Sequence, residues 1–185
     1  MINIKIPLRI GLFGGGTDVE KFYQNEYGTV SNITIDKFIH ISVKFLNQSF
    51  EEKFRLNYSD TERVRNINLI KNKIIKNNLL YNNINDPLYI GSISDVPAGT
   101  GLGSSSSFCV GLNLAINKLL NKKISNKNLA ERACHIEINM GKSNIGKQDQ
   151  YAASYKGFNN FLFKKNKVIV SSLKSKKEIM DNLFK

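Results

Sequence analysis

With 185 residues and 41% hydrophobic content, the chain can bury one sizeable core but is short for two complete domains. Its net charge of +12 comes largely from lysines scattered along the sequence, without the clustered basic stripe and interleaved aromatic residues of a nucleic-acid-binding face. No nucleic-acid partner is therefore predicted. The positive charge is more simply explained by attraction of an anionic small molecule, such as a nucleotide or a sugar phosphate. Cys109 and Cys134 form no CxxC pair, and the two histidines have no companion at metal-ligand spacing.

Neither a membrane segment nor an export signal is predicted. No stretch is apolar enough to span a bilayer, and the apolar residues 1–10 are interrupted by Lys5 and Arg9. The two cysteines stand in apolar helical contexts, which suits buried, reduced thiols. The expected location is the cytoplasm, with no membrane partner.

The first strand is predicted over 2–12, where apolar and polar residues alternate. It ends at a glycine turn, Gly14-Gly15-Gly16-Thr17-Asp18, which leads into a short helix containing Phe22 and Tyr23. Three consecutive glycines cost backbone entropy and need a reason. Close approach of a substrate is one such reason, and a tight structural turn is the alternative.

An antiparallel sheet is predicted from the next segments. Residues 28–35 and 37–45 indicate two β-rich segments around a turn at Asp36 and Lys37, and 53–58 alternates like a further strand. A covering amphipathic helix is then indicated by four isoleucines at helical spacing, namely Ile67, Ile70, Ile74 and Ile75.

A Gly/Ser loop over residues 97–107, Pro-Ala-Gly-Thr-Gly-Leu-Gly-Ser-Ser-Ser-Ser, lies between a strand predicted over 88–93 and a helix expected to open on serine caps. Unpaired backbone N–H groups at a helix N-terminus attract anions, and glycines let phosphate oxygens approach the backbone. The loop therefore predicts a phosphate site, with a flexible linker as the alternative. Its glycine spacing does not match the dinucleotide-binding fingerprint. Residues 141–147 resemble a P-loop, but the next residue, which a P-loop requires to be Ser or Thr, is Gln148.

The last third of the chain predicts a helix and two strands. Ser125 is placed as an N-cap of a helix that runs to Met140, with Glu137 near its end. Alternating strands over 158–163 and 168–173 are joined by a basic turn, and the residues from Lys174 onward suggest the start of a helix.

Three segments resemble the motifs of the GHMP kinases, the family of galactokinase, homoserine kinase and mevalonate kinase. The Gly/Ser loop is similar to the family's P-x-x-x-G-L-G-S-S-S loop. Pro7, Arg9 and the glycine turn are similar to the first motif of galactokinases, P-G-R-V-N-L-I-G-E-H-T-D. The segment from Gly146 to Ala153 is similar to C-G-x-M-D-Q-F, which also follows a helix that ends in a glutamate.

The resemblance implies an α+β fold of the GHMP kinase N-terminal type, similar to domain 2 of ribosomal protein S5, with a sheet layer covered by helices. It places this domain at residues 1–173 and the start of an otherwise absent C-terminal domain at 174–185. The family's third glycine-rich motif does not occur in this sequence. The resemblance therefore implies a separate C-terminal half as a partner, with a second copy of the chain as the alternative. It does not imply activity for this chain alone.

By the same resemblance, the chain would use ATP and Mg²⁺ to phosphorylate the anomeric hydroxyl of a sugar. The glycine turn and the Asp-Gln segment look most like the branch that acts on D-glycero-D-manno-heptose 7-phosphate. A fucokinase or galactokinase activity is the alternative, as is a non-catalytic module that binds a nucleotide or a sugar phosphate.

The resemblance also assigns roles to single residues. Asp149 would take or orient the hydroxyl proton, and Arg9 beside it would keep that carboxylate ionised and lower its pKa. Ser105, or its neighbour Ser104, and Glu137 would hold Mg²⁺. The sugar would contact Gly15, Gly16, Thr17 and Asp18. The nucleotide would contact Pro97, Gly99, Gly101, Leu102, Gly103, Ser104, Ser105 and Ser106.

Overall fold

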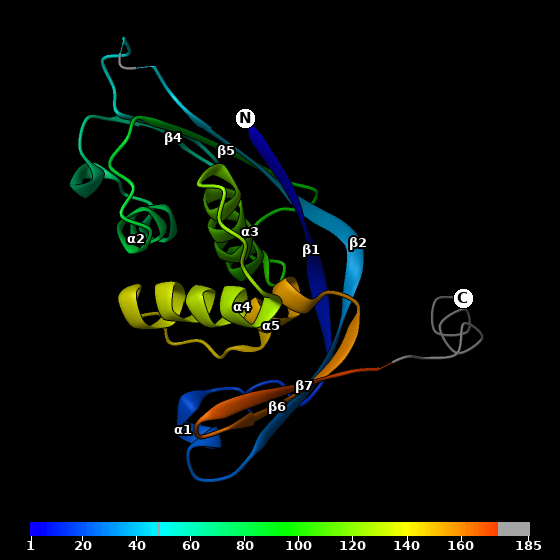
Figure 1. Ribbon diagram of the computed structural model, residues 1–185. Coiled ribbons are helices and arrows are strands. Elements are labelled where there is room, and N and C mark those ends of the chain that lie inside the picture. Colours follow the sequence, from blue (N-terminus) through cyan, green and yellow to red (C-terminus); the bar gives the residue numbers. More distant parts are fainter. Residues whose placement is uncertain (48, 174–185) are drawn as a thin grey trace.

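The computed structural model describes residues 1–47 and 49–173, and within them seven strands form one curved sheet with helices on one face (Figure 1). The strands follow the order β4-β3-β5-β2-β6-β7, and β1 pairs with the other edge of β2. Only β3 and β5 are parallel among these pairs, so the sheet is mixed rather than purely antiparallel as expected. The strands are β1 (Ile2–Phe13), β2 (Gly28–Phe45), β3 (Phe54–Asn57), β4 (Thr61–Val64), β5 (Leu88–Ser94), β6 (Phe158–Lys164) and β7 (Lys167–Ser172).

The turn predicted at Asp36 and Lys37 is wrong, because β2 runs through both residues as one strand of 18 residues. Opposite Leu8 the register against β1 shifts, so that the pair Pro7 and Phe38 is followed by the pair Arg9 and Thr34. Several residues of β2 therefore bulge outward at this point. A bulge bends a strand, and the bend lets one half of β2 pair with β5 and the other half with β6.

The helical layer lies on one face of the sheet (Figure 1). Its elements are α1 (Glu20–Tyr23), η1 (Ile67–Leu69), α2 (Lys73–Tyr81), α3 (Ser104–Leu119), α4 (Asn126–Cys134), the π-helical segment η2 (His135–Met140) and α5 (Gln148–Tyr155). The amphipathic helix predicted from Ile67 onward is divided, since a short 3-10 turn precedes α2. Ser125 is the N-cap of α4 as predicted, and its side chain accepts a hydrogen bond from Asn128 N at 3.2 Å.

The expectation that serines cap α3 is wrong. The N-cap is Gly103, with a φ of 75°, and no side chain caps this end. The serines that follow belong to the first turn of the helix, where their hydroxyls bond to other elements. The N-terminal amide groups of α3 are therefore not blocked by a capping side chain.

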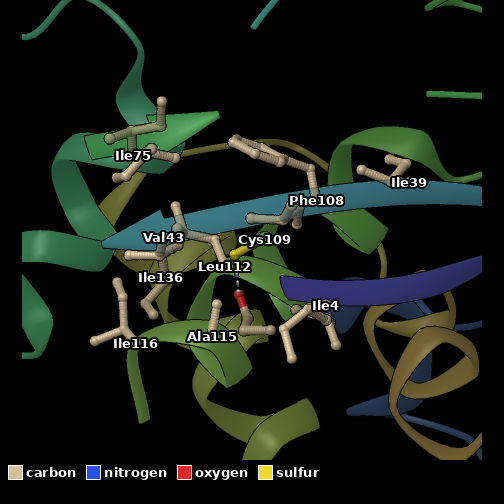
Figure 2. Close-up of a cluster of buried hydrophobic side chains, with 14 of the residues drawn as sticks. Ile4, Ile39, Val43, Ile75, Phe108, Cys109, Leu112, Ala115, Ile116 and Ile136 are labelled. Atoms are coloured by element: carbon tan, nitrogen blue, oxygen red, sulfur yellow. Dashed lines mark hydrogen bonds between the residues drawn. The ribbon is translucent and has the colours of Figure 1, made fainter. Parts of the chain in front are cut away.

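The core lies between α3 and the sheet (Figure 2). Alternate residues of β1 face the helices, and Leu112 and Ile116 of α3 meet them with no exposed surface. Close packing depends on Gly111, because a Cβ there would lie 2.6 Å from Ile41 Cδ1 and 2.8 Å from Ile6 Cγ1. The helix can thus lie directly on β1 and β2, and this contact fixes the position of the Gly/Ser loop at its N-terminus.

A second, smaller cluster packs α1 and α5 against β2 and β6. It is rich in aromatic side chains, with Tyr151 edge-on to both Phe161 and Phe163. Cys109 and Cys134 are buried and free, as predicted. Within residues 1–47 and 49–173, no helix combines the length and apolar character that crossing a membrane requires. The helix expected from Lys174 lies outside the described residues.

Candidate active site

The Gly/Ser loop, which leads into α3, is hydrogen-bonded to β1. Arg9 N donates a hydrogen bond to Leu102 O at 3.1 Å, and Arg9 Nη1 donates to Gly101 O at 2.7 Å. Ser107 Oγ donates to Pro7 O at 3.2 Å. The predicted phosphate loop is thus held by backbone and side-chain bonds to the first strand, which is inconsistent with a flexible linker.

Arg9 and Asp149 form an ion pair although 140 residues separate them in the sequence. Arg9 Nε donates to Asp149 Oδ1 at 2.7 Å, and Arg9 Nη2 lies 2.5 Å from the same oxygen. A Cβ at Gly103 would lie 3.2 Å from Asp149 Oδ2, so this carboxylate stands directly beside the N-cap of α3. The α5 helix places it there, with Asp149 in its first turn and no side-chain cap at Lys147.

The pKa of Asp149 differs from the expectation. Burial of the carboxyl raises its pKa, and the charge and hydrogen bonds of Arg9 offset only part of this effect. The net shift is upward, whereas the ion pair alone would lower the pKa. An elevated pKa makes the ionised group a better proton acceptor than an ordinary aspartate.

Glu137 lies at the centre of a buried polar cluster beneath the first turn of α3. Its carboxylate accepts hydrogen bonds from Ser105 Oγ at 2.7 Å, from Ser106 Oγ at 2.8 Å and from Gln150 Nε2 at 2.7 Å. The π-helical segment η2 brings Glu137 inward, and local π-helical turns occur frequently at functional sites. Hydroxyl and carboxylate oxygens are ligands that suit Mg²⁺, so Ser105 and Glu137 fit this ion.

The three glycines of the glycine turn have different surroundings. A Cβ at Gly14 would lie 1.8 Å from Thr29 O, so Gly14 is needed for the turn itself. No atom lies within 4 Å of a Cβ at Gly15 or Gly16. The requirement of a tight turn therefore explains Gly14. It does not explain Gly15 and Gly16, which border open space.

Asp18 connects the glycine turn to the start of α5. It is 1% exposed, and its carboxylate accepts hydrogen bonds from Gly16 N at 3.2 Å and from Gln148 N at 2.9 Å. Lys147 N also donates to Asp18 O at 3.3 Å. The predicted contact of Asp18 with a sugar stays a prediction, but the same carboxylate also fixes the helix that carries Asp149.

Gly146→Ala is expected to disrupt this connection. A Cβ at Gly146 would lie 1.9 Å from Asp18 Oδ2, so the carboxylate would have to shift away from its donors Gly16 N and Gln148 N. Crowding of a packed site costs about 1–3 kcal/mol, so the midpoint of thermal or denaturant unfolding should fall. Gly15→Ala is the matched control, because its Cβ meets open space. Equal stability of the two variants would contradict this account of Asp18.

Two pockets meet at Ser105, which lines both of them. The polar pocket, of about 420 Å³, contains Asp18, Glu137 and Asp149 together with residues 143–146. The apolar pocket, of about 530 Å³, is bordered by residues 97–99 and 104–105 of the Gly/Ser loop, and its apolar lining includes Ile39, Ile74, Ile93, Val96 and Phe108. A ligand could therefore lie across the loop with one end in each pocket.

One wall of the apolar pocket is held by the buried carboxylate of Glu62. It accepts hydrogen bonds from Tyr58 Oη at 2.8 Å, from Lys71 N at 2.7 Å and from Asn72 N at 3.2 Å. Tyr58 and Asn72 both line the pocket. Burial, together with Glu62, raises the pKa of Tyr58 to about 12, so its hydroxyl stays protonated and keeps this bond at neutral pH.

The structure thus brings together residues from every predicted motif. Arg9, the glycine turn, the Gly/Ser loop, Glu137 and Asp149 surround the polar pocket or its rim. Sequence reasoning missed Gln150 and Glu62. Gln150 follows Asp149 within the segment that carried the resemblance, whereas nothing in the sequence distinguishes Glu62 from a surface glutamate.

Comparison with known proteins agrees with this arrangement. Residues 68–157 match the family model described as GHMP kinases N terminal domain. A Campylobacter jejuni protein named D-glycero-alpha-D-manno-heptose 7-phosphate kinase is 34% identical over 194 residues, which include 98% of this chain and 57% of that protein. A solved structure from Bacteroides thetaiotaomicron, described as a D-glycero-D-manno-heptose 1-phosphate kinase, has a TM-score of 0.89 at 30% identity, over 99% of this chain and 63% of that one.

The fold extends to more distant kinases. The mevalonate kinase of Methanococcus jannaschii has a TM-score of 0.71 at 24% identity, over 94% of this chain and 56% of that one, which shows a shared fold alone. The chain spans 57% of the length of the Campylobacter jejuni relative. The α+β fold predicted from the sequence is confirmed. Residues 68–157 of the chain therefore carry a GHMP kinase N-terminal domain.

Proposed function

We propose that the chain is the nucleotide- and sugar-binding part of a sugar kinase that transfers the γ-phosphoryl group of ATP to the anomeric hydroxyl of a sugar. The observation that carries this proposal is the position of Asp149. Its carboxylate is held by Arg9 beside Gly103, where the phosphate loop meets the polar pocket. A proton acceptor at the end of a phosphate site is the arrangement that phosphoryl transfer to a hydroxyl requires.

The nucleotide would lie across the Gly/Ser loop. The apolar pocket suits a purine base, and its wall offers Tyr58 and Asn72 as polar partners. The phosphates would approach the N-terminus of α3, where free amide groups and the helix dipole attract negative charge. The γ-phosphoryl group would then enter the polar pocket.

Ser105 and Glu137 would hold Mg²⁺ at the junction of the two pockets. When bound, the ion would neutralise charge on the phosphates. The remaining steps use groups of the chain itself. As the sugar oxygen bonds to the γ-phosphorus, the bond from phosphorus to the ADP oxygen breaks, and the hydroxyl proton passes to Asp149 Oδ2. Arg9 holds the other carboxylate oxygen in place.

The substrate proposed is D-glycero-D-manno-heptose 7-phosphate, in line with the name of the Campylobacter jejuni relative. The net charge of +12 would favour a substrate that already carries a phosphate. Gly15 and Gly16 leave open space beside the polar pocket, where a bulkier turn would restrict a seven-carbon sugar. Fucose and galactose are the competing substrates.

A panel of sugars is expected to show the heptose phosphate binding more tightly than galactose or fucose. Calorimetry of the chain with each sugar, in the presence of ADP and Mg²⁺, measures this preference. A kinase assay follows on the chain alone and on the chain mixed with the C-terminal part of the Campylobacter jejuni relative. Preference for galactose or fucose would contradict the heptose assignment.

The competing function is a module that binds a nucleotide or a sugar phosphate without catalysis. The match covers 57% of the relative that is named a kinase, so it does not by itself assign catalysis to these residues. Under this alternative, calorimetry would detect both ligands, but no phosphoryl transfer would occur even with the C-terminal part present. Transfer in the mixture would exclude it.

A further inference from the structure

The side-chain amide of Gln150 is fully buried against Glu137. Its Nε2 donates to Glu137 Oε2 at 2.7 Å and to Ser106 Oγ at 3.1 Å. Its Oε1 has no hydrogen-bond partner among the described residues. An unpaired buried oxygen is costly, and a methionine of similar size would fill this place without it. The amide therefore needs a reason beyond packing, and its N–H donor supplies one.

The two carboxylate oxygens of Glu137 are bound unequally. Oε2 accepts from two donors, Ser106 Oγ at 2.8 Å and Gln150 Nε2. Oε1 accepts from Ser105 Oγ alone, at 2.7 Å. Ser105 also lines both pockets, so the lightly bonded oxygen of Glu137 is the one paired with the hydroxyl at their junction.

We propose that Gln150 is a positioning residue that occupies Glu137 Oε2 and leaves one carboxylate oxygen, Oε1, for a divalent cation. This inference rests on the proposed function. A single oxygen suits Mg²⁺, which is small and demands near-ideal octahedral geometry, whereas Ca²⁺ readily takes both oxygens of a carboxylate. Gln150 thereby sets a preference for Mg²⁺ over Ca²⁺ at this site.

The test measures how each cation supports nucleotide binding by the chain. The affinity of a fluorescent ADP analogue is determined in saturating Mg²⁺, in saturating Ca²⁺ and in EDTA. Wild type should bind the analogue more tightly with Mg²⁺ than with Ca²⁺. Gln150→Met keeps the volume but removes one of the two donors to Glu137 Oε2, so that each carboxylate oxygen is left with a single serine hydroxyl and the two oxygens become equally accessible to a cation. The ratio of Mg²⁺-supported to Ca²⁺-supported affinity should then fall about tenfold, the low end of the effects seen when groups that orient metal ligands are replaced.

Two further variants separate positioning from packing. Ser106→Ala removes the other donor to Oε2 and should shift the ratio in the same direction, which keeps the test decisive if Gln150→Met does not fold. Ser154→Ala is the matched control. It removes a buried hydrogen bond from the Ser154 hydroxyl to the main-chain carbonyl of Gln150 and leaves the side-chain amide of Gln150 unchanged. Its ratio should equal that of wild type.

The outcomes distinguish this inference from the function on which it rests. A Mg²⁺ preference in wild type that is unchanged in folded Gln150→Met and Ser106→Ala overturns the role of Gln150 alone. Nucleotide binding by wild type that is the same in Mg²⁺, Ca²⁺ and EDTA overturns the proposed metal site together with it. A shift of similar size in Ser154→Ala shows that packing of α5, and not the amide of Gln150, sets the ratio.

Discussion

Gly101→Val is expected to abolish ATP binding while the chain stays folded. No atom lies within 4 Å of a Cβ at Gly101, so the valine side chain would project into the open space over the Gly/Ser loop. In our proposal the phosphates pass through this space on their way to the N-terminus of α3. The carbonyl of Gly101 also accepts the hydrogen bond from Arg9 Nη1, so a shift of the backbone would disturb the ion pair with Asp149.

The control for this prediction is Gly157→Val. Gly157 has a φ of +78° against +74° at Gly101, and its Cβ also meets open space, but it borders β6 and lines neither the apolar nor the polar pocket. Both substitutions should cost roughly 1–3 kcal/mol of folding free energy from the strained φ. Calorimetry with ATP and Mg²⁺ should show lost binding only for Gly101→Val. Unchanged affinity in that folded variant would show that residues 97–107 do not bind phosphate.

The alternation of apolar and polar residues predicted most strands, because each of these strands buries alternate residues against the helices. It failed at Asp36 and Lys37, where β2 bulges opposite Leu8 and two charged residues interrupt the alternation without ending the strand. The sequence of one strand does not show how many residues of the partner strand lie opposite one of its own residues at a bulge. The same limit applies to the pairing of β3 with β5, since parallel neighbours come from a crossover that the sequence of neither strand encodes.

The site was predictable as far as its motifs were continuous in sequence. The Gly/Ser loop and the glycine turn could be identified from spacing alone, whereas the pairing of Arg9 with Asp149 entered through the family resemblance and depends on the fold. Even then, the direction of the pKa shift of Asp149 was missed, because burial is a property of the folded chain. Glu62 was missed for the same reason, since two of its three partners are main-chain amides on a neighbouring segment.

Asp149→Asn is expected to lower kcat by about 10²–10⁴-fold while ATP affinity persists, as measured on the chain combined with the C-terminal part of the Campylobacter jejuni relative. The amide keeps the size of the carboxylate and can still accept a hydrogen bond from Arg9, but it cannot take a proton. Loss of the ion pair with Arg9 should lower the stability of the variant, but no capping bond of α5 is lost, so the variant should still fold, which circular dichroism can check. Asp36→Asn, at the exposed bulge of β2, is the control and should retain full activity.

The pH dependence of kcat adds a second signature of the same group. Asp149 accepts a proton only when ionised, so the rate of wild type should fall as the pH drops through its pKa. Since burial raises this pKa above that of an ordinary aspartate, the fall should begin at a correspondingly higher pH. The residual rate of Asp149→Asn should lack this acidic limb. Near-normal kcat in the variant, or a limb that persists in it, would reduce Asp149 to the structural partner of Arg9 and leave the proton acceptor to another group.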